Sequence, residues 1–125
     1  MTTPVLDTGA LIGIERRDKR MLALLAELLR EEITSYVPAG VVAQAWRGSP
    51  RQHDVARLLA TETVRVEPLD DHTARQVGLV LTSSGTCDIV DGHVALLARR
   101  VRGTVFTSDP GDIAAIDPTL GIVPV

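Results

Sequence analysis

Five aspartates stand where predicted strands end or predicted helices begin, and carboxylates in such places can hold a metal ion. They are Asp7, Asp88, Asp91, Asp109 and Asp112. If the strands are parallel neighbours, these carboxylates converge at one edge of a sheet. Like charges held together are costly unless a cation neutralises them. The spacing therefore indicates a divalent-metal site suited to phosphate chemistry.

Carboxylate oxygens are the ligands that Mg²⁺ and Mn²⁺ prefer. One or two such ions can polarise a phosphodiester, lower the pKa of a bound water and steady the leaving oxygen. A site of this kind requires no histidine or serine nucleophile. His93, two residues after Asp91, is accordingly expected to be a helix-surface or packing residue rather than a ligand.

Each aspartate also has a purely structural interpretation, because aspartate is a favoured residue at helix N-termini. Asp109 precedes Pro110, a good first helical residue, and Asp112 then falls in the first turn. Asp88 and Asp91 have the same spacing. Taken singly, each residue fits either interpretation, but three separate segments deliver acids to one predicted edge. Asp88 and Asp112 are the best candidates for a capping or supporting role only.

Short strand signals separated by helical patterns must position these residues. We expect strands at Pro4–Leu6, Ile33–Val37, Val64–Glu67, Thr104–Thr107 and Ile122–Pro124. We expect helices at about Gly9–Arg16, Lys19–Arg30, Ala39–Arg47, Arg51–Ala60, Asp71–Ser83, Ile89–Val101 and Gly111–Ala115, with Gly103 as the C-terminal stop of the sixth. Strands alternating with helices predict an α/β fold, with a mainly parallel sheet covered on both faces.

Length and composition indicate one globular domain spanning residues 1–125. The single cysteine, Cys87, excludes an internal disulfide and a thiolate metal site. No apolar run approaches the roughly 18 residues of a membrane span, so no membrane association is expected. The chain reaches Asp7 within a few residues, which leaves no room for a signal peptide and predicts a cytoplasmic location.

The charge pattern bears on the ligand. A net charge of −3 argues weakly against a general nucleic-acid binder, although bound cations would offset part of the acidic site. Lys19 is the only lysine, so arginines supply nearly all the positive charge. Guanidinium groups suit bidentate phosphate contacts, and solvated helix faces are the alternative explanation for each arginine group.

Two other phosphate chemistries are disfavoured. The chain has no glycine-rich loop followed by Lys-Ser or Lys-Thr, which makes nucleoside triphosphate hydrolysis a poor fit. Gly9 stands two residues after Asp7, where an aspartyl-phosphate phosphatase would place a second acid.

Three motifs in order resemble the PIN-domain family, specifically the VapC-type toxins of bacterial toxin–antitoxin pairs. The first is Val5-Leu6-Asp7-Thr8-Gly9-Ala10-Leu11-Ile12, similar to the family's opening strand with its metal-binding aspartate. The second is Asp91-Gly92-His93-Val94-Ala95-Leu96-Leu97-Ala98, similar to the central helix motif. The third is Phe106-Thr107-Ser108-Asp109-Pro110-Gly111-Asp112-Ile113, similar to the late strand-and-acid motif. The match spans nearly the whole chain.

This resemblance implies a PIN-like three-layer α/β/α fold with about five strands, and an Mg²⁺- or Mn²⁺-dependent endoribonuclease. It also implies a homodimer neutralised by a cognate VapB-type antitoxin. The resemblance gives Asp7, Asp91 and Asp109 the metal-ligand and catalytic roles. Asp88 would be a neighbouring acid and Asp112 a substitute or supporting partner for Asp109.

The same resemblance gives supporting roles to three further residues. Thr8 and Ser108 would orient the carboxylates by hydrogen bonds. Gln44 stands where the family usually has a glutamate. Glutamine keeps the size and an acceptor oxygen but loses the charge, which predicts a weaker or differently occupied second metal site. A surface glutamine beside a packed Trp46 is the alternative.

Three functions stay open from the sequence. The chain can be an active ribonuclease toxin, or a catalytically impaired PIN domain that binds RNA or its antitoxin, or an ordinary α/β domain whose aspartates only cap helices. The apolar segment Met21–Leu29 favours burial on two sides, either at a dimer or antitoxin interface or deep in the core.

Overall fold

The computed structural model describes residues 2–125 and contains one five-stranded sheet in which every pairing is parallel. The strand order is β3-β2-β1-β4-β5. The strands are β1 (Pro4–Leu6), β2 (Ser35–Pro38), β3 (Val64–Glu67), β4 (Thr104–Thr107) and β5 (Gly121–Pro124). The expected mainly parallel α/β fold is confirmed.

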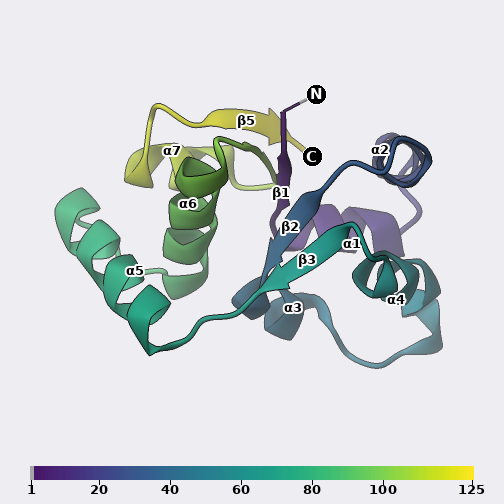
Figure 1. Cartoon of the computed structure of the whole chain (residues 1–125), viewed down its shortest axis with the longest axis horizontal. Helices are drawn as coiled ribbons and strands as arrows, with labels where there is room; N and C mark the ends of the chain where they lie inside the picture. The colour runs from purple at the N-terminus through teal and green to yellow at the C-terminus, as the bar shows by residue number, and fades with distance from the viewer. Residues whose placement is uncertain (1) are drawn as a thin grey trace.

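Helices cover both faces of this sheet, which gives three layers (Figure 1). One group comprises α1 (Thr8–Glu15), α2 (Lys19–Arg30), α3 (Ala39–Ala45), the short 3₁₀ helix η1 (Pro50–Gln52) and α4 (His53–Ala60). The other comprises α5 (Asp71–Ser84), α6 (Ile89–Val101) and α7 (Pro110–Ile116). Helix α3 packs against members of both groups, α1 and α6, at the edge where β2 ends.

The strand order reverses direction at the centre of the sheet. From β1 the chain moves outward to β2 and β3, and then crosses back to β4 and β5 on the other side of β1. In open parallel sheets, ligands bind beyond the carboxyl ends of the strands at such a reversal. Asp7 follows β1 and Asp109 lies two residues after β4, so the topology delivers both residues to this point.

Helix α6 lies deep in the molecule, and its residues from Gly92 to Ala98 are all buried. Gly92 allows α5 to approach closely, because a Cβ atom there would lie 2.8 Å from Leu81 Cδ2 and 3.0 Å from Val77 Cγ1. This contact fixes the first turn of α6 against α5, and with it the position of the neighbouring Asp91.

Helix α6 ends at Val101, as the sequence predicts, but Gly103 is not the left-handed residue that follows it. The left-handed residue is Arg102, with φ 51°, while Gly103 donates its N–H to the Ala98 carbonyl at 2.9 Å. Gly103 is needed for space, because a Cβ atom there would lie 2.5 Å from the Thr3 carbonyl oxygen. The glycine thus lets α6 lead directly into β4 beside the first residues of the chain.

Helix α2 buries a single stripe of residues. Met21, Leu25 and Leu28 are buried, whereas Leu24 and Leu29 are partly buried and pack at the margin of the core. Within the described chain, α2 is therefore an amphipathic covering helix and not a deeply buried one.

No helix among residues 2–125 combines the length and apolar character that crossing a membrane requires.

Candidate metal centre

Asp7 is buried at the end of β1, with 4% of its surface exposed. Its Oδ1 accepts a hydrogen bond from the Thr8 N–H at 2.7 Å, and its Oδ2 accepts one from the Thr107 hydroxyl at 2.8 Å. Its own N–H donates to the Phe106 carbonyl at 3.0 Å. Asp7 is thus the N-cap of α1, and at the same time its carboxylate is held at the centre of the sheet edge.

Thr107 is a structural partner that the sequence reasoning missed. It is fully buried at the end of β4, and its hydroxyl oxygen also accepts a hydrogen bond from the Asp109 N–H at 2.9 Å. One hydroxyl therefore links the carboxylate of Asp7 to the backbone of Asp109. The alternation of β4, in which Val105 and Thr107 share the buried face, was the signal that could have identified it.

Ser108 occupies a different position from the one expected. It is exposed and lies against Gly9, where an added Cβ atom would come 2.3 Å from the Ser108 hydroxyl oxygen. Among residues 2–125 no hydrogen bond joins Ser108 to a carboxylate. The close approach of Gly9 and Ser108 instead holds the start of α1 against the segment after β4.

Asp88 and Asp91 lie at the start of α6. Asp88 is the N-cap and accepts a hydrogen bond from the Asp91 N–H at 2.9 Å. Both residues, together with Asp112 of α7, line an acidic hollow of about 280 Å³. The capping interpretation therefore holds for Asp88, and its charge nevertheless lies beside that of Asp91.

The five aspartates act on one another electrostatically. The pKa of Asp91 is raised to about 7, first by burial and then by the negative charges of its neighbours. In decreasing order, these neighbours are Asp88, Asp7, Asp112 and Asp109. The fold has thus brought together acids from three separate segments, at a cost that a bound cation would relieve.

Gln44 belongs to this edge of the molecule as well. It projects from α3, and its Oε1 accepts a hydrogen bond from the Thr8 hydroxyl at 2.5 Å. Thr8 therefore supports Asp7 through its backbone N–H, while its hydroxyl is engaged by Gln44. The side chain at the position expected for a glutamate is thus linked to Asp7 through Thr8.

These residues fit a divalent cation in donor type and in charge. Their oxygen donors suit Mg²⁺ or Mn²⁺. The pKa of Asp91 is raised first by burial and then by its acidic neighbours, and a bound cation would relieve both costs. As the side chains lie, no three carboxylate, histidine or cysteine side chains within residues 2–125 are close enough together to hold one ion. Binding would therefore have to draw the carboxylates inward.

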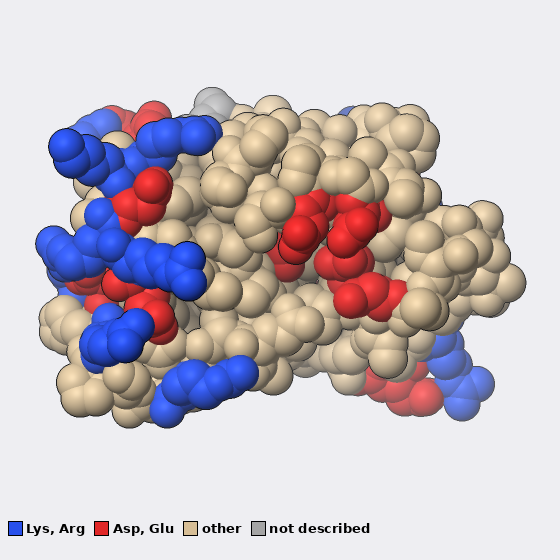
Figure 2. All heavy atoms as spheres, turned by 180° about the vertical axis from the view of Figure 1, so that it is seen from behind, with Lys and Arg blue, Asp and Glu red and all other residues tan. Residues whose placement is uncertain are grey.

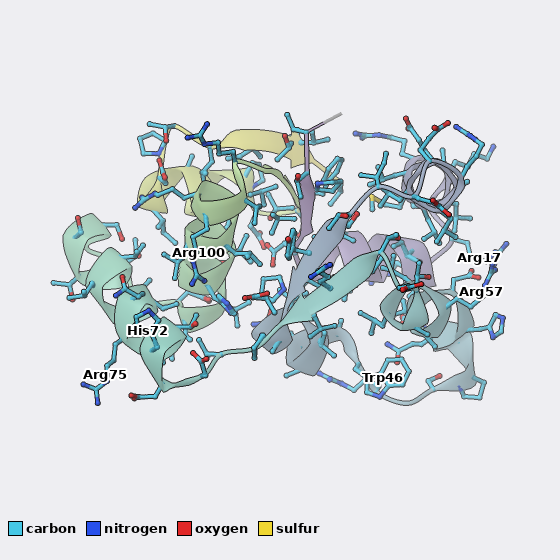
Figure 3. The ribbon with its side chains drawn as sticks, in the orientation of Figure 1. Arg17, Trp46, Arg57, His72, Arg75 and Arg100 are labelled. Carbon is cyan, nitrogen blue, oxygen red and sulfur yellow. The ribbon has the colours of Figure 1, made fainter. Side chains whose placement is uncertain are left out.

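The surface around the acids is strongly patterned. Acidic side chains gather near the middle of the face shown in Figure 2, and most of the basic side chains of that face form a band at one end. That end is formed by α2 and α4, as comparison with Figure 1 indicates. Arg17 and Arg57 point outward there (Figure 3) and share Asp54 as a partner, at 2.6 Å and 3.9 Å.

Comparison with known proteins is informative at the level of family and fold. No curated protein matches the chain. Solved structures do match, among them a crystal structure of FitAcB from Neisseria gonorrhoeae and a structure of FitAB bound to an IR36 DNA fragment. The first has a TM-score of 0.63 and 23% identity, with 96% of each chain covered. The second has a TM-score of 0.66 and 22% identity, covering 98% of this chain and 94% of the other. At such identities the likeness establishes a common fold.

A family model gives the assignment. The model described as "PIN domain" matches residues 5–117, a span that contains Asp7 after β1, Asp91 at the start of α6, and Asp109 after β4. Because this match covers nearly the whole chain and the parallel fold agrees with it, the protein belongs to the PIN-domain family.

Proposed function

We propose that this protein is a metal-dependent endoribonuclease, the VapC-type toxin of a type II toxin–antitoxin pair. PIN domains are generally nucleases, and the observation that carries the proposal here is the acidic cluster at the sheet reversal. Four other aspartates raise the pKa of Asp91 there. Asp7, Asp91 and Asp109 are the proposed catalytic metal ligands, with Asp88 and Asp112 as supporting acids.

The residues of this chain would divide the work as follows. Asp7, fixed by Thr8 and Thr107, would hold Mg²⁺ or Mn²⁺ together with Asp91 and Asp109. The ion would supply an activated water and stabilise charge on the phosphodiester. Arginines would hold the RNA backbone, because the chain has only 2% aromatic residues with which to stack bases.

Cleavage of a structured RNA in the presence of Mg²⁺ or Mn²⁺ tests this proposal. Asp7→Ala should abolish cleavage. Thr107→Val should lower activity or metal affinity about 10- to 100-fold, because it releases one oxygen of Asp7 without removing a charge. Asp71→Ala is the control, since Asp71 is exposed and pairs with Arg75 at 3.1 Å on α5. Cleavage that survives Asp7→Ala would sink the proposal.

A catalytically impaired PIN domain that acts by binding RNA or an antitoxin is the second candidate. Gln44 favours it, because an uncharged side chain adjoins Thr8 and Asp7. Gln44→Glu should then strengthen Mn²⁺ binding and raise cleavage, whereas Gln44→Ala should leave both low. Unchanged metal affinity and cleavage in Gln44→Glu would remove Gln44 from the site. RNA binding without cleavage under every metal condition would favour this second function.

A cognate VapB-type antitoxin and a homodimer complete the proposal, with the protein acting in the cytoplasm. Support comes from the family and from the similar fold of the FitAcB and FitAB structures. A shallow hollow of about 350 Å³ beside α2, lined by Leu24, Phe106, Val123 and Val125 among others, offers apolar surface for a partner. Size-exclusion chromatography with mass measurement checks the dimer, and a monomer at micromolar concentration would contradict it.

A further inference from the structure

A third hollow, of about 430 Å³, adjoins the metal centre. Gly9 and Ser108 form part of its wall. These two residues directly follow Thr8 and directly precede Asp109, so the hollow borders the segments that carry the proposed metal ligands. It shares no lining residue with the acidic hollow of Asp88, Asp91 and Asp112.

Within residues 2–125, Arg16 is the one cationic side chain that lines this hollow. Arg16 is exposed, lines the hollow, and forms no salt bridge within the described part of the chain. The neighbouring Arg17, by contrast, is paired with Asp54 at 2.6 Å. The one acid in the lining, Asp18, accepts a hydrogen bond from the Met21 N–H at 3.1 Å and caps α2. The guanidinium of Arg16 is therefore available to an anion.

The rest of the wall is apolar. Ile12, Met21 and Val125 contribute to it, beside the backbone of Gly9 and Gly13. Its volume lies within the range of small-ligand sites, roughly 300–1,000 Å³. A cation at one side and an apolar wall at the other match a nucleotide, whose phosphate is anionic and whose base presents flat apolar faces.

We propose that this hollow is a nucleotide subsite that holds one nucleotide of single-stranded RNA beside the phosphodiester at the metal centre. Arg16 binds the phosphate of that nucleotide, and Ile12, Met21 and Val125 contact its base or ribose. The inference rests on RNA being the substrate, as in the proposed function. It adds that the strand runs from the acidic cluster toward α2.

Binding of a short oligouridylate in EDTA tests the subsite without cleavage, with the dissociation constant measured over a series of salt concentrations. Arg16→Ala should weaken binding several-fold and reduce the slope of log K against log salt by about 0.7, the value for one phosphate contact to a single strand. Arg16→Lys should keep most of the slope. Arg75→Ala is the charge-matched control on α5, far from the hollow (Figure 3), and should leave the slope unchanged. An unchanged slope in Arg16→Ala, or an equal loss in Arg75→Ala, overturns the subsite.

A second measurement locates the nucleotide. Amide resonances of Gly13 and Val125 should shift in the wild-type protein when oligouridylate is added, and Ile12→Trp, which fills the hollow without changing the charge, should suppress both shifts. If Ile12→Trp does not fold, the wild-type shifts decide alone, and resonances that do not move overturn the subsite.

RNA that binds through Arg16 but is never cleaved with Mn²⁺ counts against the ribonuclease only. Cleavage that depends on Asp7 but is unaffected by Arg16→Ala counts against the subsite only.

Discussion

At the scale of single residues, His93 is a buried polar side chain to which the proposed site gives no role. It is 1% exposed, and neither ring nitrogen has a hydrogen-bond partner within the described residues. Burial is the largest influence on its pKa, which lies below the ordinary value of 6.5. Glu67 and Asp70 raise this pKa slightly and Arg100 lowers it. Of the two positions expected from the sequence, helix surface or packed interior, His93 takes the packed one.

His93→Leu should stabilise the protein by about 1–2 kcal/mol, because an apolar side chain of similar size removes two unsatisfied polar atoms. The folded-state pKa of His93 is lowered. The stability that neutral His93 contributes is therefore fully present above the unfolded pKa of about 6.5 and is lost as pH falls below that value. Urea denaturation of both proteins at pH 7.5 and about 5.5 measures both effects. A variant less stable than the wild type at both pH values would show that packing of the imidazole ring stabilises the protein by more than its two unpaired nitrogens cost.

At the scale of elements, the position of Gln44 depends on how α3 is anchored. α3 is only seven residues long, and a buried glutamine in η1 secures its C-terminal end. Gln52 donates from Nε2 to the Ala45 carbonyl and to Glu15 Oε1, both at 2.7 Å, and accepts from the Arg47 N–H at 2.9 Å. One side chain thus ties the ends of α1 and α3 to η1.

Gln52→Leu should destabilise the fold by about 2–3 kcal/mol, because it keeps the volume but leaves a buried carbonyl and an amide without partners. Chemical denaturation measures the loss. Arg51→Leu is the matched control, because Arg51 is exposed and holds Glu15 only at 3.6 Å. Equal losses in the two variants would contradict the anchoring role of Gln52.

At the scale of the whole molecule, the fold places mutually repelling carboxylates at the sheet reversal. The folded-state pKa of Asp91, about 7, lies above its unfolded value of 3.8. Its contribution to stability is therefore complete below about pH 3.8 and is lost as pH rises through about 7. This trend opposes that of His93, and the two can be separated by substitution.

Without metal, Asp91→Asn should be about 1–2 kcal/mol more stable than the wild type at pH 8, a figure reduced for solvent access to the carboxyl group. The difference in stability should shrink as pH falls and vanish near about pH 3.8. Mn²⁺ should raise the Tm of the wild type at pH 8 and that of Asp91→Asn much less. Thermal melts with and without Mn²⁺ measure both effects, and identical pH profiles for the two proteins would contradict the shared-charge account.

Most of the framework could be predicted from the sequence. Strand and helix periods are local properties, so the five strands and the main helices were expected within a few residues of their observed bounds. Motif order also identified Asp7, Asp91 and Asp109 as a set. Gly103 was correctly placed just past the end of α6, but the local pattern could not show why a glycine stands there, because the Thr3 carbonyl that it approaches comes from the other end of the chain.

Only the tertiary structure decided which segments that are distant in sequence contact one another. The sequence by itself determined which carboxylates follow strands and begin helices, because alternation and capping depend on neighbouring residues. It could not determine that Thr107, rather than Ser108, orients Asp7, or that Thr8 reaches Gln44, since these contacts span 100 and 36 positions. Strand register and helix packing set such distances, and both follow from burial of the whole core.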